Sequence, residues 1–540
     1  MSGVPEADEA IGCGINGADH GNDSNVMVFE YDHEQRDLRA LAELICSGEI
    51  PPKMVEDIDL RKFTNMSTPL FKPSFDRVES ECMRVYEERK LEIKEFLGDL
   101  NGQISLSVDR LRYKTYRFCG HYLCLSASFI DENWKLRNWV LYCHSLSNPL
   151  DDFLKVLEGW GFGNKVSTLT MTNADHGDCP ELIEFVETHI QEKKKLEVSR
   201  QLVHVYCCGE MISQMVQDAF DKIKDIIDKV LKLYSTKSLP LWYLTNSKLK
   251  HAVELWSKGE FSSKYVTDSS DVPSPEEWKK VEGVCKIVES IYEVSSALFE
   301  SKPLTANVFL YHLHELRDIL TQISATDSGS FNGSIVEGML TRFDKYWNDM
   351  FMLLAIASAL DPRLKLKYVE FVSMRLNGME GSLQVADVLG AIHKLYDDYL
   401  IRFPVKENFM CYSSCSGLDT EMESSPPKQV NHTLNVLQDY HQFIQLGIQS
   451  TKKSELDCYL EEPVIHESPD FDVLTWWSTA DAKYPTLSRM ARDFLAIPVS
   501  LATSYEAFYS KPRPADESLV CLKPDLMNAL MCTRSWSCKH

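Results

Sequence analysis

The amino-acid sequence predicts an α/β plus α fold, in which a mixed sheet covered by helices is joined to a large all-helical region. Residues 104–208 contain runs of alternating apolar and polar side chains, with helical stretches between some of them. Residues 240–400 carry apolar side chains at three- and four-residue steps almost throughout. A final block, about 450–536, is rich in aromatic residues and again helical in pattern.

Size and composition set limits on the class of protein. A chain of 540 residues is longer than one hydrophobic core usually serves, so we expect at least two structural units or one fold with a large insertion. The longest apolar runs, such as residues 350–360, are shorter than the ~18 residues that a membrane span needs. The first residues lack the basic and apolar regions of a secretory signal. We therefore expect neither a membrane partner nor secretion.

The cysteine pattern favours free thiols over disulfides or zinc. Sixteen cysteines are scattered along the chain, and Cys124, Cys143, Cys207 and Cys208 lie in strand-like runs where we expect buried thiols. The short Cys- and His-containing stretches at 411–415 and 532–540 have no second half at a usable distance. We expect no metal and no cofactor.

The chain begins with two predicted regions of different character. Residues 1–35 contain no Lys or Arg, and we interpret them as a disordered acidic leader. Residues 36–100 form a predicted N-terminal helical region, because apolar residues recur at helical spacing with charged residues between them.

The predicted sheet lies in residues 101–239. Three strands come first, the second and third joined by a tight turn at Asp131–Asn133, and helix and strand then alternate. The first strand alternates Ile104, Leu106 and Val108 with polar residues. The predicted strands are 104–109, 121–131, 134–146, 165–172 and 200–208, with helices at 149–161 and 214–234.

The remainder is predicted to be helical, interrupted by a linker. Residues 240–410 read as a helical insertion, in which Pro275 begins a helix whose first turn is acidic. Residues 411–449 are a Ser- and Pro-rich linker followed by a helix. Within the insertion, Trp347 and its neighbour Tyr346 are expected in the helical core, the alternative being a stacking platform for nucleic-acid bases.

Several stretches resemble the hAT superfamily of DNA transposases, in particular its host-adopted RICESLEEPER-like group. The carrying residues are HYLCLSASFIDENWKLRNWVLYC with GWGFGNKVSTLTMTNAD, then FDKYWNDMFMLLAIASALDPRLKLKYVEF, then SELDCYLEEP with FDVLTWWSTADAKYPTLSRMARDFLAIPVS. The similarity spans roughly residues 36–536. It implies a ribonuclease-H-like core, a large all-helical insertion and a C-terminal hAT dimerisation region at 450–536.

The resemblance also implies a catalytic site that this chain has lost. Active members hold two divalent metals with three carboxylates. The first position falls on Asp109, but the second falls on Thr172 and the third on Tyr505. The neighbouring Glu506 would point about 100° away around a helix. We therefore predict a degenerate triad with the remnant Asp109 and no enzymatic activity or small-molecule substrate; an active transposase is the least favoured hypothesis.

The DNA-recognition module of the family is also expected to be missing. That module is a BED-type zinc finger, and before residue 36 the chain offers only Cys13, His20 and His33. A net charge of −23 argues against non-specific coating of nucleic acid. DNA contacts made by the core itself stay open, and the basic runs near 191–200 and 361–368 are most simply solvated helix faces.

The C-terminal block carries the strongest surviving feature, an apolar stripe at helical spacing. By pattern alone, this stripe would pack against the chain's own core. Because the family dimerises through this segment, we predict self-association with a second copy or a related protein. Some of the same residues are expected to pack in the core as well. The predicted dimerisation residues are Leu474, Trp476, Trp477, Tyr484, Pro485, Leu487, Met490, Ala491, Phe494, Leu495, Ile497 and Pro498.

The sequence thus predicts a catalytically inactive, dimeric, transposase-derived protein. We expect it in the nucleus, with the cytoplasm also open, in association with DNA or chromatin. The alternative is a protein-interaction scaffold that does not bind DNA.

Overall fold

A computed structural model supplies the structure of the chain. It divides into two compact units, one of residues 1–91 with 521–539 and one of residues 92–520, which are described separately. The structure describes residues 23–56, 74–114, 119–145, 149–161, 165–171, 188, 202–233, 249–250, 252–254, 256–258, 272–300, 304–327, 329–404, 453–466, 468, 470–501, 519 and 522–537.

The first unit is helical. It contains α1 (Asp23–Ser47), the short η1 (Pro52–Glu56), most of α3 (Phe75–Asp99) and α21 (Pro524–Ser537). Tyr86 of α3 stacks on Trp536 of α21 at 5.8 Å, so residues from the two ends of the sequence form one core. The predicted boundary of a disordered leader at residue 35 is wrong, because α1 begins at Asp23. Acidic side chains stabilise the first turn of a helix, because they interact favourably with the positive end of the helix dipole. An acidic composition is therefore compatible with the start of α1.

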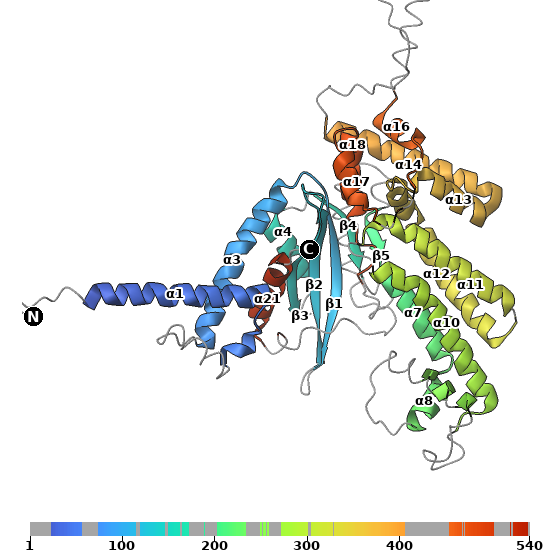
Figure 1. Cartoon of the computed structure of the whole chain (residues 1–540), viewed down its shortest axis with the longest axis horizontal. Coiled ribbons are helices and arrows are strands. Elements are labelled where there is room, and N and C mark those ends of the chain that lie inside the picture. Colours follow the sequence, from blue (N-terminus) through green and yellow to red (C-terminus); the bar gives the residue numbers. More distant parts are fainter. Residues whose placement is uncertain are drawn as a thin grey trace, which may run out of the picture. The chain divides into compact units, whose positions relative to one another are not determined.

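The second unit is built on a mixed sheet of five strands (Figure 1). The strand order is β3-β2-β1-β4-β5, with β1 antiparallel to β2, β2 antiparallel to β3, and β4 parallel to both β1 and β5. This arrangement confirms the predicted mixed sheet in which three consecutive strands come first, and most of the segment between β4 and β5 lies outside the described residues. The strands are β1 (Ile104–Lys114), β2 (Cys119–Ile130), β3 (Leu136–Ser145), β4 (Val166–Met171) and β5 (His204–Tyr206), and α4 (Pro149–Trp160) lies between β3 and β4 in sequence.

The central strands are buried on both faces. In β1 the alternating Ile104, Leu106 and Val108 are buried, and so are Ser105 and Ser107 on the opposite face. Small hydroxyl side chains can be buried there because they need few partners. The turn between β2 and β3 closes on the Asp131 carboxylate, which accepts hydrogen bonds from the backbone amides of residues 133 and 135 and from a guanidinium at 137.

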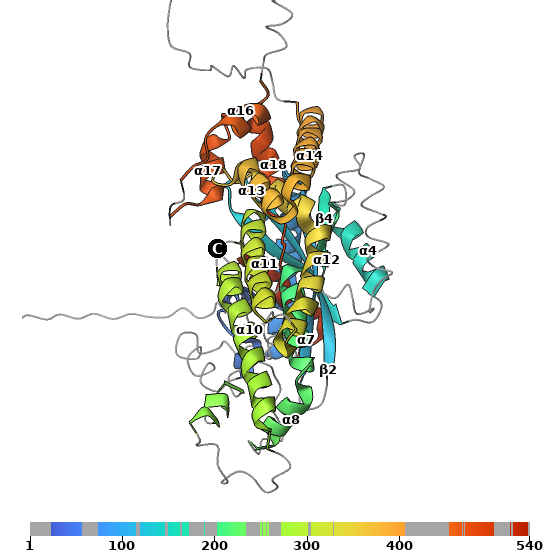
Figure 2. The same ribbon diagram turned by 90° about the vertical axis from the view of Figure 1, so that its right-hand side faces the viewer.

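Long helices follow the sheet in sequence, and α7 runs side by side with α10, α11 and α12 of the insertion (Figure 2). The single helix predicted at 214–234 is two, broken between Asp221 and Lys224. The predicted start at Pro275, with its acidic first turn, is confirmed. The helices are α7 (Cys208–Asp221), α8 (Lys224–Leu233), α10 (Pro275–Glu300), η3 (Ala306–Val308), α11 (Phe309–Thr326), α12 (Phe331–Ala359), α13 (Lys365–Asn377), η4 (Gly378–Glu380) and α14 (Gly381–Arg402).

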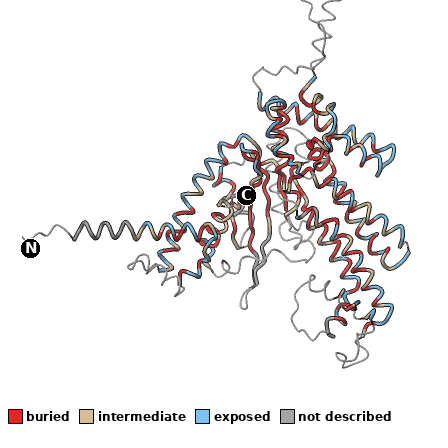
Figure 3. Tube along the Cα trace, viewed as in Figure 1, coloured by how far each residue is buried: buried red, intermediate tan, exposed pale blue. Residues whose placement is uncertain are grey.

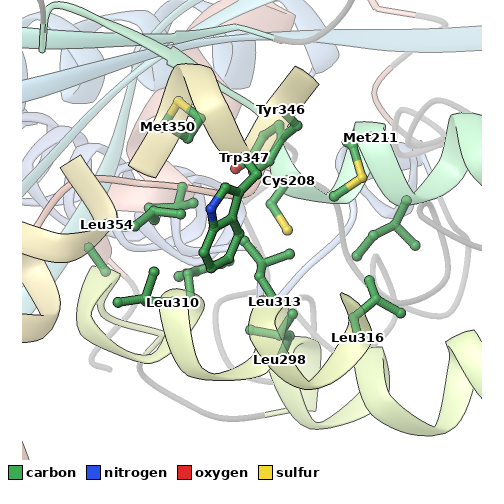
Figure 4. Packing of buried hydrophobic residues seen from close by; sticks show 14 of the residues in the cluster. Cys208, Met211, Leu298, Leu310, Leu313, Leu316, Tyr346, Trp347, Met350 and Leu354 are labelled. Carbon is green, nitrogen blue, oxygen red and sulfur yellow. The ribbon is translucent and has the colours of Figure 1, made fainter. Parts of the chain in front are cut away.

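Helix α12 runs through the middle of this core. Trp347 is 5% exposed and packs among side chains of α7, α10 and α11, including Cys208, Leu298 and Leu313 (Figure 4). Tyr346 is 6% exposed. The prediction that these two aromatic residues belong to the helical core is confirmed, because neither ring offers a free face for a nucleic-acid base.

The C-terminal part of the second unit adds shorter helices to the described residues. They are α16 (Glu455–Glu461), α17 (Val473–Ala480) and α18 (Pro485–Leu495). Figure 3 shows that buried residues continue from the sheet through the insertion into these helices. The expected buried thiols Cys124, Cys143, Cys207 and Cys208 are confirmed. Within the described residues, no helix has the length and apolar character needed to cross a bilayer.

Candidate functional site

Asp109 lies on β1 at the edge of the sheet where the parallel strands end. The last pair between β1 and β4 joins Val108 to Met171, and Asp109 is the next residue of β1. Met171 in turn pairs with Tyr206, the last residue of β5. The carboxyl ends of β4 and β5 therefore meet at this edge beside Asp109, which is the usual place for a site in such a sheet.

A segment from the far end of the sequence reaches the same edge. The backbone amide of Cys208 donates a hydrogen bond to the carbonyl of Val499 at 2.9 Å. The amide of Leu501 donates to Sγ of Cys207 at 3.3 Å. The chain that precedes residue 502 thus lies beside the end of β5. The other two positions singled out for catalysis, Thr172 and Tyr505, lie outside the described residues, as does Glu506.

A pocket of about 350 Å³ opens beside this edge, between α7 and α12. Met171, Tyr206 and Cys207 connect it to the sheet, and α7 and α12 supply the remaining wall. The other lining residues are Glu210, Met211, Gln214, Asp218, Gly338, Thr341, Arg342, Lys345, Tyr346 and Asp349.

Two sets of contacts fix the shape of this pocket. The Arg342 guanidinium donates two hydrogen bonds to Oδ2 of Asp218, at 2.8 and 3.0 Å, and one to Oε1 of Gln214 at 2.7 Å, which ties α12 to α7. The Tyr346 hydroxyl donates to the carbonyl of Tyr206 at 3.2 Å. Burial raises the pKa of Tyr346 well above its ordinary value, so the phenol stays protonated and stays a donor.

The structure places most of the predicted dimerisation residues inside their own chain. Trp476, Pro485 and Pro498 are partly exposed. The buried ones are Leu474, Trp477, Tyr484, Leu487, Met490, Ala491, Phe494, Leu495 and Ile497. These buried side chains build the framework of the C-terminal helices, and their part in an interface between copies stays a prediction.

The C-terminal helices are fastened to the end of α12 by polar contacts that sequence patterns did not reveal. The Trp477 indole donates to the carbonyl of Leu360 at 2.9 Å, and the Tyr459 hydroxyl donates to the carbonyl of Ala359 at 3.1 Å. Nζ of Lys365, 2% exposed, donates to the carbonyls of Tyr459 and Glu462 at 2.5 and 2.8 Å. Its ammonium also lies over the Tyr459 ring at 4.4 Å. Burial lowers the pKa of Lys365 to about 8.

Two buried carboxylates hold α18 in place. Glu455 of α16 accepts hydrogen bonds from the backbone amides of Thr486 and Leu487, which are otherwise unpaired donors in the first turn of α18. Asp493 accepts from the backbone amide of Gln103 at 2.7 Å and from the Tyr399 hydroxyl at 2.5 Å. The sequence signal for these contacts was an acid at a position where the helical spacing in 455–495 predicts a buried side chain. A buried charge requires hydrogen-bond partners, so each such acid indicates a specific contact.

Comparison with known proteins agrees with this architecture. Family models match three stretches: the hAT family C-terminal dimerisation region at 455–537, the hAT-like transposase RNase-H fold at 307–399, and the ZBED1 RNase-like domain at 119–202. The last covers β2 to β4, and the second covers the helices from η3 to α14.

Several curated relatives match the chain over almost its whole length. Zinc finger BED domain-containing protein RICESLEEPER 1 of Oryza sativa is 28% identical over 93% of this chain and 74% of its own length. DAYSLEEPER of Arabidopsis thaliana is 27% identical over 95% of this chain and 75% of its own. A putative AC transposase of Zea mays is 27% identical over 96% of this chain and 67% of its own.

The fold and these matches show that the chain is similar to hAT transposases and to proteins related to them. The chain matches two hAT family models and is similar to the RICESLEEPER and DAYSLEEPER proteins, which confirms the resemblance drawn from its sequence.

Proposed function

We propose that this chain is a catalytically inactive, dimeric nuclear protein that associates with DNA or chromatin. The observation that carries the proposal is the set of residues at the three catalytic positions of the family, where only Asp109 is an acid. The other two positions hold Thr172 and Tyr505.

These three side chains do not fit a pair of divalent metal ions. Hard cations such as Mg²⁺ take negatively charged oxygen ligands, and two of them close together require several carboxylates to balance their charge. A threonine hydroxyl is neutral, and a tyrosine hydroxyl has an ordinary pKa of about 10. One carboxylate cannot neutralise two dications, so we derive no metal-dependent step for this chain.

A strand-cleavage assay tests the loss of catalysis. The full chain is incubated with supercoiled plasmid and Mg²⁺ or Mn²⁺, beside an Asp109→Asn variant. We expect the same background nicking from both proteins, because Asp109 alone supports no reaction. Metal-dependent nicking that exceeds the background and disappears in the variant would show an active nuclease and overturn the proposal.

Self-association is supported by the match of residues 455–537 to a region described as a dimerisation region. Among the predicted interface residues, Trp476 suits a contact best. It is partly exposed and is supported from behind by Tyr459 and Trp477, whose ring centroids lie 6.1 and 4.9 Å away. Partly exposed tryptophans held in place by neighbours are favoured anchors of protein interfaces.

The mass of the full chain, measured by light scattering over a range of concentrations, tests the dimer. We expect a dimer that Trp476→Ala weakens by roughly thirtyfold or more in Kd. Thr479→Ala, an exposed change one turn further along α17, is the matched control and should leave the dimer intact. A monomer at all concentrations would contradict self-association, and equal effects of the two variants would remove Trp476 from the interface.

Association with DNA is supported by the family alone, and the charge of −23 favours the second candidate, a protein-interaction scaffold. The relatives' names include a BED zinc finger. Binding of the full chain to a 30-base-pair duplex across a salt series separates the two candidates. We expect an affinity that falls as salt rises, since phosphate contacts release counterions. Absent or salt-independent binding would favour the scaffold, and cytoplasmic fluorescence of a tagged chain would contradict the nuclear assignment.

A further inference from the structure

Two buried cysteines meet where α1 packs on α3 in the first unit. Sγ of Cys46 in α1 lies 3.9 Å from the carbonyl oxygen of Cys82 in α3, and Sγ of Cys82 lies 3.9 Å from the carbonyl oxygen of Ala42 in α1. The two thiols are within hydrogen-bond distance of each other. All three residues are at most 1% exposed. Their small side chains let the two helices approach closely, so the sulfur atoms are neighbours in the folded chain.

The surroundings hold the two thiols together and leave one of them close to a helix end. Arg39 of α1 forms an ion pair with Glu88 of α3 at 2.6 Å, and Arg77 of α3 forms one with Glu34 of α1 at 2.5 Å. These contacts restrict the movement of one helix along the other. Cys46 is the last residue but one of α1. Helix ends open more readily than helix centres, so this thiol can reach solvent without unfolding of the whole unit.

The two thiols differ in acidity. The hydrogen bond with Cys82 lowers the pKa of Cys46, and the charges of Arg89 and Arg39 act in the same direction against the effect of burial. The same hydrogen bond, together with burial, raises the pKa of Cys82. The thiolate is the attacking species in disulfide exchange. Cys46 is therefore the better nucleophile, and Cys82 stays a protonated thiol beside it.

We propose that Cys46 and Cys82 form a reversible disulfide, made by exchange with a small disulfide such as glutathione disulfide. The Cys46 thiolate attacks one sulfur of the oxidant, forms a mixed disulfide and releases one glutathione thiolate. The Cys82 thiol gives its proton to that thiolate and attacks the Cys46 sulfur, which forms the bond between α1 and α3 and releases the second glutathione. Two protein thiols are oxidised, and one glutathione disulfide is reduced to two glutathione thiols.

This bond makes the stability of the first unit depend on the redox state. In intracellular proteins such disulfides are transient and respond to the thiol pool. A link between residues 46 and 82 closes a loop in the unfolded chain and so lowers its entropy. The oxidised form therefore holds α1 more firmly than the reduced form. The inference does not depend on DNA binding or on dimerisation.

A redox titration of the full chain tests the proposal. The chain is equilibrated in glutathione buffers from reducing to oxidising, quenched with acid, treated with N-ethylmaleimide to block free thiols, digested and analysed by mass spectrometry without reduction. We expect a pair of peptides linked through Cys46 and Cys82, which dithiothreitol separates. Hydrogen exchange of the α1 amides should be roughly tenfold slower, or slower still, in the oxidised chain.

Two variants test the roles of the two thiols. Alanine suits both buried positions, because a buried free thiol packs as a small apolar group. In Cys82→Ala, we expect Cys46 to accumulate as the mixed disulfide with glutathione, since the thiol that resolves it is gone. In Cys46→Ala, Cys82 should stay reduced. Circular dichroism melts confirm that each variant is folded.

The chain offers a second thiol pair as a matched control. Cys124 of β2 and Cys143 of β3 lie directly opposite each other in the sheet, and both are buried. Neither lies at a helix end, and strand pairing resists the local opening that an oxidant needs. We expect the linked fraction of this pair to be roughly tenfold lower than that of Cys46 and Cys82 in the same buffer.

Three results would overturn the proposal. The linked peptides could be absent even in the most oxidising buffer. The Cys124–Cys143 pair could link to the same extent, which would mean that oxidation follows proximity alone. The roles could be reversed, with glutathione on Cys82 in Cys46→Ala and none on Cys46 in Cys82→Ala.

Discussion

The Tyr399 hydroxyl of α14 donates a hydrogen bond of 2.5 Å to the carboxylate of Asp493 in α18. Both side chains are buried, and the other carboxylate oxygen accepts the backbone amide of Gln103 just before β1. One side chain therefore joins the helical insertion, the C-terminal helices and the start of the sheet.

Loss of that hydroxyl should destabilise the second unit. In Tyr399→Phe the buried Asp493 loses a donor to a charged group, and we expect the free energy of unfolding to fall by about 1.5–3 kcal/mol. Urea denaturation followed by tryptophan fluorescence measures it. Tyr311→Phe, at a side chain 45% exposed, is the control and should cost less than about 0.5 kcal/mol. If both variants lost the same free energy of unfolding, the buried hydrogen bond of Tyr399 would contribute no more to stability than an exposed hydroxyl.

The pKa of Lys365 predicts a pH dependence of stability. Because that pKa is about 8 in the folded chain and about 10.4 when unfolded, the unfolded state binds more protons between these values. This residue's contribution to the free energy of unfolding therefore rises as pH increases from about 8 to about 10. Lys365→Met removes the titrating group. The difference in stability between wild type and Lys365→Met, measured at pH 7, 8, 9 and 10, should shift in favour of the wild type, and a constant difference would contradict the lowered pKa.

Arg492 should be sensitive even to a conservative change. Its guanidinium lies 4.1 Å from the centre of the Trp134 ring and donates a hydrogen bond of 2.7 Å to the carbonyl of Asp131. Arg492→Lys keeps the charge but loses the planar group that stacks on the indole, so we expect a loss of about 1 kcal/mol. Arg492→Ala should cost about 2 kcal/mol or more. Thermal melts in parallel test this order; equal stability of the lysine variant and the wild type would mean that charge alone matters.

Trp477 should behave as a core residue when it is replaced. It is fully buried, and Trp477→Ala removes its packing and its hydrogen bond to the carbonyl of Leu360, so we expect a loss of about 3–5 kcal/mol. Trp477→Phe keeps a ring and leaves the carbonyl unpaired, for an expected loss of about 1–3 kcal/mol. Differential scanning calorimetry ranks the two. A dimer that dissociates in Trp477→Phe without any loss of monomer stability would instead place this ring at the interface.

The sheet and the long helices were predictable because apolar side chains recur in them at the residue spacing of a strand or of a helix. The alternation in 104–109 follows from one apolar face and one face of small polar residues, and the helical spacing from Pro275 onward follows from one apolar face. The break between α7 and α8 was missed, because the apolar spacing continues through Lys222 and Ile223 while the backbone bends. The extension of α1 to Asp23 was not predicted, because the acidic composition of residues 1–35, which contain no Lys or Arg, is typical of a disordered segment.

The candidate site was predictable in position but not in its surroundings. The resemblance assigned the first catalytic position to Asp109, and the structure places this residue directly after the last pair between β1 and β4. The pocket was not predictable, because α7 and α12 meet only in the folded chain: the Arg342–Asp218 ion pair joins residues 124 positions apart. The apolar stripe in the C-terminal block predicted which residues are buried. The helical spacing is the same whether a side chain is buried within its own chain or against a second chain, so it could not separate core packing from dimerisation.

The hydrogen bond from the amide of Gln103 to Asp493 spans 390 residues of sequence. During synthesis on the ribosome, Gln103 emerges long before Asp493, so this contact can form only after α18 has been made. A chain truncated before α18 therefore lacks this contact, and we expect its sheet and α14 to expose side chains that are buried in the full chain.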